Sequence, residues 1–271
     1  MYWHLTAILW SSSGLFIKLV SWNSLALAGL RSFIAVSVQL AYIRHPHFTW
    51  SFSQIGGAAA YARTLILFVT ATKLTTAADA ILLQYTAPVY VAFLSAWFLG
   101  EPAHWFDWIT IFVVIGGIAL FFLDHLTVGN LLGNVCAILS GVSFACFVLF
   151  MRKQKSESPL ETVILGNLLT GLVGIPFMFD SVPNTLSWFG IIFMGVVQLG
   201  LSNVLYSQAI KHTTALEAIL IPGIEPILNP IWVFLILEEA PGRWALMGGF
   251  IVLMSVTTRC VIAALRKDDL T

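Results

Sequence analysis

The sequence predicts an all-α integral membrane protein with ten transmembrane helices arranged as two inverted five-helix repeats. Three observations lead to this fold class: an apolar composition, ten long apolar runs, and a segment that occurs twice. Of the 271 residues, 59% are hydrophobic and 10% are charged, whereas charged residues make up roughly 25% of an ordinary soluble domain. So apolar a chain belongs in a lipid bilayer. The net charge is zero, so we expect no nucleic-acid partner.

The chain divides into ten apolar runs, each close to the roughly 20 residues that a transmembrane helix needs. The runs cover residues 3–20, 24–43, 54–72, 76–98, 103–123, 128–151, 160–180, 187–210, 214–237 and 242–265. Short polar connectors separate them. The break in the middle of the chain predicts a first repeat over residues 1–125 and a second repeat over residues 126–271.

One segment occurs in both halves. Residues 71–82 read ATKLTTAADAIL and residues 209–220 read AIKHTTALEAIL, with eight of the twelve positions identical. The same offset places Pro88 over Pro226. Because the offset spans five apolar runs, the second copy must cross the membrane in the opposite direction. Inverted repeats of this kind are typical of transporters, in which two halves rock about a site near the bilayer midplane.

Lys and Arg residues in the short connectors predict the orientation of the chain. If the amino terminus lies inside, the cytoplasmic side has seven of these residues and the opposite side has two, Lys73 and Arg243, or three with Lys18 at the end of the first run. The seven are Arg44, Arg152, Lys153, Lys155, Lys211, Arg266 and Lys267. We therefore expect a multi-pass protein of the cell membrane, inner or plasma, with both termini cytoplasmic.

Motifs in both halves are similar to those of one family. The first half contains AILWSSSGLFIK (7–18) and a pattern of Thr75, Ala77, Ala80, Ile81, Leu82, Leu83 and Pro88 that leads into FLGE (98–101). The second half keeps the pattern as Thr213, Ala215, Ala218, Ile219, Leu220 and Pro226, leading into FLILEE (234–239). Over its whole length the chain resembles the EamA family of the drug/metabolite transporter superfamily.

The resemblance implies a ten-helix carrier built as five plus five inverted helices, and not an enzyme. Members of this family move amino acids, other small metabolites and, in some cases, choline. It also implies that helices 1–4 and 6–9 surround a central cavity, with helices 5 and 10 outside. Asp79 and Glu217 depart from the family pattern, which has a neutral polar residue, usually Asn or Ser, at this position. Arg63 in the middle of a helix is also unusual.

Ionisable side chains inside apolar runs are the first candidates for a site, because a charge in hydrocarbon is costly unless it faces a cavity or a partner. The candidates are Arg63, Asp79, Glu217 and Glu225. Asp79 and Glu217 are repeat equivalents about one turn inside their helices. Each is either a helix-end cap, which the helix dipole favours, or a gating or coupling residue. Glu225 lies about two turns deeper, where no helix end is expected, and either faces a cavity or forms a buried pair, for example with Arg63.

The ninth run is rich in proline. Pro222, Pro226 and Pro230 recur at four-residue intervals, whereas the fourth run has only Pro88. Proline removes a backbone donor and frees a carbonyl group one turn earlier, and a freed carbonyl in a membrane needs a polar neighbour or a water-filled cavity. Carriers place their substrates at broken helices of this kind. A simple packing kink is the alternative.

Aromatic and polar side chains complete the candidate site. The rings are Trp10, Tyr85, Tyr90 and Tyr206, and the polar side chains are Ser13, Gln84, Asn203 and Asn229, with Gln198 as a further hydrogen-bonding group. Rings beside an acidic group suit an ammonium ion through cation–π contact. Packing between helices, or a position in the interfacial belt, explains each of these residues nearly as well.

The motifs indicate no catalytic or cofactor site. Cys136, Cys146 and Cys260 lack metal-ligand spacing, and no phosphate-binding loop or zinc motif occurs. The sequence therefore predicts a secondary transporter of a small polar metabolite, amino-acid-like or an amine such as choline, that uses no cofactor and acts as a monomer or homodimer. Protons are a candidate coupling ion, since buried carboxyl groups titrate closer to neutral pH. The alternatives are an exporter of drugs, nucleosides or other metabolites with the same fold, an intramembrane enzyme, and a channel or sensor.

Overall fold

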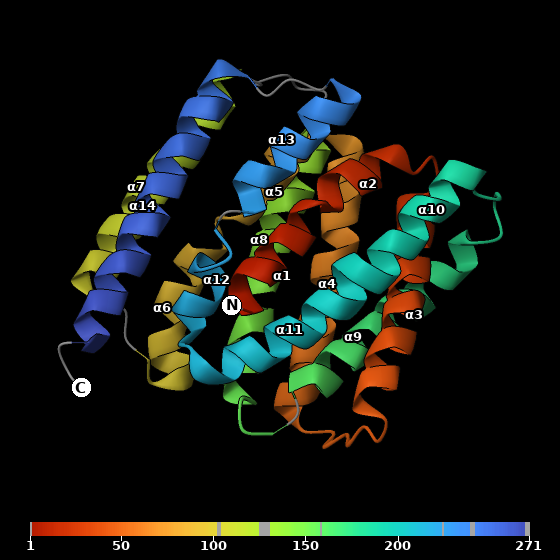
Figure 1. Ribbon diagram of the computed structural model, residues 1–271, viewed down its shortest axis with the longest axis horizontal. Helices are drawn as coiled ribbons and strands as arrows, with labels where there is room; N and C mark the ends of the chain where they lie inside the picture. The colour runs from red at the N-terminus through yellow and green to blue at the C-terminus, as the bar shows by residue number, and fades with distance from the viewer. Residues whose placement is uncertain are drawn as a thin grey trace.

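The computed structural model of the protein describes residues 2–101, 104–124, 131–157, 159–223, 225–238 and 242–268. Over these residues the chain is helical and contains no β-strand (Figure 1). The first half forms α1 (Tyr2–Ser11), α2 (Ser13–Leu19), α3 (Ser24–Ile43), α4 (Phe52–Leu74), α5 (Ala77–Gln84), α6 (Ala87–Leu99) and α7 (Trp105–Asp124). The second half forms α8 (Leu131–Lys153), α9 (Pro159–Gly174), the 3₁₀ turn η2 (Ile175–Phe177), α10 (Thr185–Phe193), the π-helix η3 (Met194–Leu201), α11 (Ser202–Ala209), the 3₁₀ turn η4 (Ile210–His212), α12 (Ala215–Leu220), α13 (Glu225–Leu237) and α14 (Arg243–Asp268).

Seven stretches of the described chain are long and apolar enough to cross a membrane. They are Ser24–Ile43, Phe52–Leu74, Ala77–Leu99, Leu131–Lys153, Pro159–Phe177, Thr185–His212 and Ala215–Leu237. The first, fifth and tenth predicted runs contain shorter apolar helices, Leu5–Leu19, Trp105–Gly117 and Leu246–Arg259. The structure thus supports a helical, multi-pass membrane protein.

The outer surface of the helices is apolar. Large side chains such as Trp97 (84% exposed), Phe112 and Phe250 point away from the protein interior. Apolar patches of this extent are rare on soluble monomers and mark a surface that another apolar phase covers. Polar residues instead fix the helix starts: Asn23, Ser51 and Asn184 each accept a hydrogen bond from a backbone N–H two or three residues later, as expected of N-caps.

Three of the predicted single helices are interrupted. α1 gives way to α2 at Ser12, α5 gives way to α6 at residues 85–86, and α12 ends at Leu220 before α13 begins. Pro88 and Pro226 each occupy the first turn of the second helix of their pair, where a missing N–H breaks no helical hydrogen bond. These two prolines therefore begin new helices, whereas Pro222 lies in the turn before α13 and Pro230 lies inside α13.

Helices from the two halves pack against each other throughout the protein. α4 lies against α8 and α9, α3 lies against α9 and η3, and α1 lies against α11 and α13. The broken helices cross, so that α5 packs on α13 and α6 packs on α12. α7 and α14 pack mainly on one another and stand to one side of the bundle (Figure 1). This matches the expectation that helices 5 and 10 lie outside the central group.

The contact between α3 and α9 depends on two glycines. A Cβ atom on Gly174 would lie 2.7 Å from both the Cα of Gly29 and the carbonyl oxygen of Leu25. Both obstacles are backbone atoms, which cannot rotate away. Close approach of helix backbones at small residues is a principal source of packing energy in membranes.

We expect Gly174→Ala to destabilise the protein by about 1–3 kcal/mol, the usual cost of overpacking. Gly116 in α7 is the matched control, since a Cβ atom there would meet nothing within 4 Å, and Gly116→Ala should preserve or raise stability. Thermal unfolding in detergent measures both variants. Equal melting temperatures for the two would contradict the close packing of α3 on α9.

Candidate functional site

The three helix breaks adjoin one central cavity. Trp10 and Ser13 flank the break at Ser12, Gln84 precedes the break between α5 and α6, and Glu225 follows the break before α13; all four line the cavity. The volume is about 60 Å³, well below the roughly 300–1,000 Å³ of typical ligand pockets. The full lining is Trp10, Ser13, Arg31, Tyr61, Thr64, Leu65, Phe68, Gln84, Phe144, Gln198, Leu199 and Glu225.

Glu225 is the first residue of α13 and is only 7% exposed. The hydroxyl group of Tyr85 lies 3.2 Å from Oε2 of Glu225 and 3.0 Å from the carbonyl oxygen of Pro222. The single hydroxyl proton can be donated to either oxygen, and the Tyr85 hydroxyl group contacts both the carboxyl group and the turn before α13 from the end of α5. The sequence placed Glu225 in a helix interior, which is wrong. Residues 221–223 form a turn, and Glu225 meets the favourable end of a new helix dipole.

Arg31 is the cationic residue of the cavity, and the sequence analysis missed it. It lies in α3 and is 1% exposed. Its Nη1 donates to Oε1 of Gln198 at 3.5 Å and approaches the sulfur of Met194 at 3.8 Å. Its Nε is buried without a hydrogen-bond partner. An arginine inside the run 24–43 was a visible signal, because the rule that singled out Arg63 applies equally to Arg31.

The π-helix η3 brings Gln198 to Arg31. A π-helix inserts an extra residue per turn and occurs frequently at functional sites. Gly195 permits the close approach, since a Cβ atom there would lie 2.6 Å from Cβ of Ile34 on α3. Ser202 donates to the carbonyl group of Gln198 and accepts a hydrogen bond of 2.8 Å from Nε1 of Trp10. The widened turn is therefore held to both α3 and α1.

Aromatic rings form a wall beside the two charges. Trp10 packs on Tyr206 with ring centroids 5.0 Å apart and on Phe144 at 6.2 Å. Tyr61 packs on Phe147 at 4.6 Å. Tyr206 stands behind Trp10 and does not line the cavity itself. The wall leaves rings of Trp10, Tyr61 and Phe144 facing the space next to Glu225 and Arg31.

The predicted polar residues mostly hold the helices around this cavity. Asn229 donates to Oγ of Ser13 at 3.2 Å, and Gly14 leaves room for its side chain. Asn203 donates to the hydroxyl group of Tyr61 at 2.6 Å. Gln84 donates to Oγ of Ser140 at 2.8 Å. Ser13 and Gln84 line the cavity, whereas Asn203 and Asn229 act from behind it.

Asp79 and Glu217 lie away from the cavity lining, at the starts of α5 and α12. The backbone N–H of Asp79 donates to Thr76, and its carboxylate accepts from Thr75 at 3.2 Å. Glu217 forms a reciprocal capping box with Thr214. The geometry is that of helix caps, the first of the two interpretations that the sequence left open.

Two predicted residues are placed elsewhere. Arg63 on α4 is exposed and forms no pair with Glu225 in the described part of the chain, so the suggested Arg63–Glu225 pair is wrong. Tyr90 is partly buried in the packing of α6 and does not reach the cavity. Glu239, the repeat equivalent of Glu101, lies outside the described residues.

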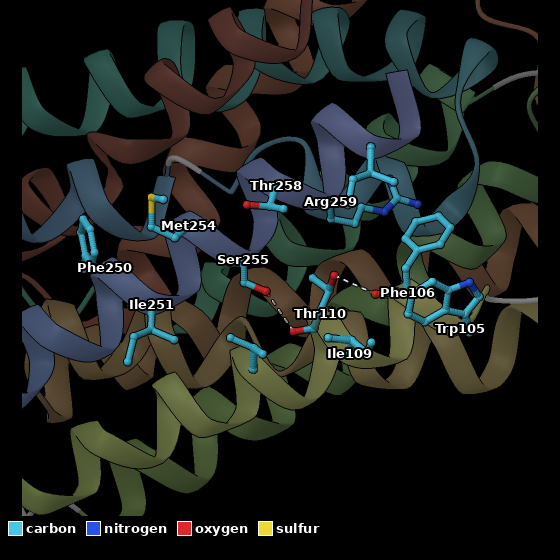
Figure 2. A pocket seen from close by; sticks show the side chains of 12 residues that line it. Trp105, Phe106, Ile109, Thr110, Phe250, Ile251, Met254, Ser255, Thr258 and Arg259 are labelled. Carbon is cyan, nitrogen blue, oxygen red and sulfur yellow. Dashed lines mark hydrogen bonds between the residues drawn. The ribbon is translucent and has the colours of Figure 1, made fainter. Parts of the chain in front are cut away.

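A second pocket lies on the periphery between α7 and α14. Figure 2 shows this groove, with Phe250 and Met254 towards one end and Arg259 and Phe106 towards the other. Its volume is about 440 Å³. Nε of Arg259 pairs with the carboxylate of Asp107 at 2.9 Å, so the charge of Arg259 is already matched. The remaining lining is largely apolar, and the groove contains none of the predicted site residues.

The sequence is similar to those of known transporters. A model of the EamA-like transporter family matches residues 1–123 and 131–258. The chain belongs to the EamA family. An uncharacterized transporter from Archaeoglobus fulgidus is 28% identical over 93% of this chain and 92% of its own length. The pseudopaline exporter CntI of Pseudomonas aeruginosa is 29% identical over 66% of this chain, which spans 64% of that relative.

A solved structure described as "Crystal structure of protein" has the same fold, with a TM-score of 0.74, 18% sequence identity and coverage of 97% of this chain and 96% of the other. This EamA protein is thus a multi-pass integral membrane protein of a transporter family.

Loss of a capping carboxylate should affect stability rather than transport. We expect Asp79→Ala and Glu217→Ala each to cost about 0.3–1 kcal/mol, the usual value of a carboxylate in the first turn of a helix, while the transport rate per folded molecule remains near that of the wild type. Thermal unfolding and transport by the same purified samples measure the two effects. A large loss of transport without loss of stability would instead identify a gate or coupling residue.

Proposed function

We propose that this EamA protein is a secondary transporter of a small polar metabolite, amino-acid-like or an amine, and that it works by alternating access. The observation that carries the proposal is the central cavity, where buried Arg31 and Glu225 lie beside three helix breaks. Buried ionisable groups in a membrane protein mark substrate or ion pathways because their desolvation is otherwise uncompensated. Carriers also place their substrate sites at broken helices of this kind.

The pattern of helix contacts supports two inverted repeats, residues 1–125 and 126–271. α1 is the repeat equivalent of α8, and α11 is that of α4; α1 packs on α11, and the equivalent pair α8 and α4 also pack together. In the same way, α4 packs on α9, and the equivalent pair η3 and α3 are in contact. The separate matches of the family model to each half agree with this division.

The proposed orientation puts both termini in the cytoplasm, with the protein in the cell membrane. It rests on the distribution of Lys and Arg residues, since the end of the bundle that carries Arg152, Lys153 and Lys211 is the more basic one. The relative from P. aeruginosa is named an exporter, which makes efflux the first direction to measure.

Transport assays distinguish this function from the alternatives, an exporter of drugs or nucleosides and a channel. Proteoliposomes that contain the purified protein should exchange a labelled polar metabolite at carrier rates. Passage of drugs or nucleosides, but not of amino acids or amines, would favour the alternative exporter. Ion currents at single-channel rates would indicate a channel. Correctly folded protein that moves no solute and shows no ligand-dependent melting would contradict the transporter function itself.

Removal of the charge of Glu225 should abolish or greatly weaken transport. We expect Glu225→Gln to lower the transport rate on the order of tenfold or more, because a buried carboxyl group that is kept despite its desolvation cost is expected to act on the substrate or on a coupling ion. The protein should still fold, since glutamine has nearly the same shape. Glu157 is the control, as it lies exposed in the connector after α8. Wild-type kinetics in Glu225→Gln would refute the role of this carboxyl group.

Proton coupling through Glu225 is the remaining part of the proposal. A carboxyl group that alternates between protonated and ionised forms allows access to the cavity to change from one side of the membrane to the other without an unpaired charge in the closed cavity. We expect an imposed pH gradient, at zero membrane potential, to drive solute accumulation into proteoliposomes. If the gradient neither drives accumulation nor is dissipated when solute is added, then coupling is wrong and transport is facilitated diffusion.

A further inference from the structure

We propose that the central cavity binds a zwitterion, a neutral α-amino acid or a close analogue, with its carboxylate on Arg31 and its ammonium group on Glu225. The proposal rests on the transporter function above and narrows its substrate class. Arg31 comes from α3 and Glu225 from the start of α13, and both line the same cavity. Within the described part of the chain, the two side chains do not form an ion pair with each other or with any other residue.

Arg31 lacks an anionic partner. A guanidinium group has five N–H donors and stays protonated in proteins. The only hydrogen-bonding contacts of Arg31 in the described structure run from Nη1 to neutral acceptors, the sulfur of Met194 at 3.8 Å and Oε1 of Gln198 at 3.5 Å. Both distances are long, and the buried Nε has no acceptor at all. A carboxylate matches the planar guanidinium with two parallel hydrogen bonds, so a substrate carboxylate would supply what the protein does not.

Glu225 lacks a cationic partner. Its carboxyl group has one protein hydrogen-bonding contact in the described structure, with the hydroxyl group of Tyr85. Trp10, Tyr61 and Phe144 line the same space. An ammonium group attracts both a carboxylate and aromatic faces. The Glu225 side of the cavity therefore has the chemistry of an amine site, and the Arg31 side has that of a carboxylate site.

Only a substrate with both charges satisfies both sides at once. An amine bound to Glu225 would leave Arg31 unpaired and would be repelled by it. A simple carboxylic acid bound to Arg31 would leave Glu225 unpaired in the same way. In a medium that cannot solvate charges, either mismatch is costly. A zwitterion pairs each buried charge and adds no net charge to the closed cavity.

The rest of the lining limits the side chain of the substrate. Arg31 and Glu225 are the charged members of the lining, and Leu65, Phe68 and Leu199 contribute apolar surface. A third charge on the substrate would have no partner there. The site therefore favours amino acids with uncharged side chains over aspartate or lysine.

Counterflow in proteoliposomes tests this assignment. Vesicles are loaded with unlabelled L-alanine, L-leucine or L-phenylalanine, and entry of the labelled amino acid is followed. Ethanolamine, choline and lactate serve as competitors that carry one charge, and uridine and glucose as neutral ones. We expect exchange and competition by the neutral amino acids, and little competition by ethanolamine, choline or lactate at the same concentration.

Substitutions at the two charges should alter selectivity in opposite directions. We expect Arg31→Gln to weaken amino-acid competition by roughly 30-fold or more and to improve competition by ethanolamine. Glu225→Gln should weaken amino-acid competition to a similar extent and improve competition by lactate. A purely structural role for either residue would lower all activity without changing the order of competitors. Arg31→Lys, which keeps the charge, should retain part of the amino-acid preference.

Arg63→Gln is the matched control, because Arg63 lies in a neighbouring spanning helix with its side chain exposed; its competition profile should equal that of the wild type. Exchange of ethanolamine, choline, uridine or glucose in preference to amino acids would overturn the zwitterion site and leave the transporter function intact. Failure of folded protein to exchange any compound of the panel would count against the transporter function and this site together. The wild-type competition profile decides the substrate class even if Arg31→Gln does not fold.

Discussion

The structure depends on one constraint: hydrocarbon offers no hydrogen bonds, so each polar group must find its partner inside the protein. At the end of the bundle formed by α2, α4 and α5, lysine side chains satisfy free carbonyl groups. Nζ of Lys18 donates to the carbonyl group of Thr75 at 2.8 Å, and Nζ of Lys73 donates to that of Val20. At the centre, the carbonyl group of Pro222 accepts from the backbone N–H of Glu225 and lies 3.0 Å from the hydroxyl group of Tyr85. At the cavity, Arg31 and Glu225 have no oppositely charged partner within the described part of the chain.

The opposite end of the bundle is closed by a carboxylate that joins the two halves. Glu101 pairs with Arg152 at 2.8 Å through one oxygen and accepts from the backbone N–H of Ala215 through the other. Arg152 also donates to the carbonyl groups of Ile210 and Lys211. This largely buried salt bridge also satisfies the first turn of α12, through Ala215. The connector after α6 is therefore fixed to α8 and α12. These contacts must separate if the central cavity is to open at this end of the bundle.

The sequence was sufficient for a helical membrane protein and for the family, because each depends on local composition or on a repeated segment. It identified Glu225 as a candidate cavity residue but not the helix start at which Glu225 lies. It left Asp79 and Glu217 open between helix caps and gating residues, although Thr-x-x-Asp and Thr-x-x-Glu are local capping patterns. It could not separate Arg31 from Arg63. Both lie in runs that are apolar around the whole helix, so the sequence does not reveal which face turns inward. The π-helix η3 and the break at Ser12 were missed for a related reason: no proline marks either one, and tertiary contacts through Gly195 and Ser202 hold the widened turn.

The small size of the central cavity follows from where the helices are broken. A space of about 60 Å³ holds water molecules but not a solute with two charged ends, since one water needs roughly 10–15 Å³ by the same measure. Enlarging it by bending intact helices would break backbone hydrogen bonds that lipid cannot replace. At residues 85–86 and 221–223 the α-helical pattern gives way to turns, in which Thr86 donates to the carbonyl group of Leu83 and Gly223 to that of Leu220. Tyr85 connects the two turns through a single hydroxyl group. A change of direction at these turns leaves the helical bonds of α3 and α4 intact, and this makes the breaks beside Glu225, rather than the long helices, the place where the cavity can expand.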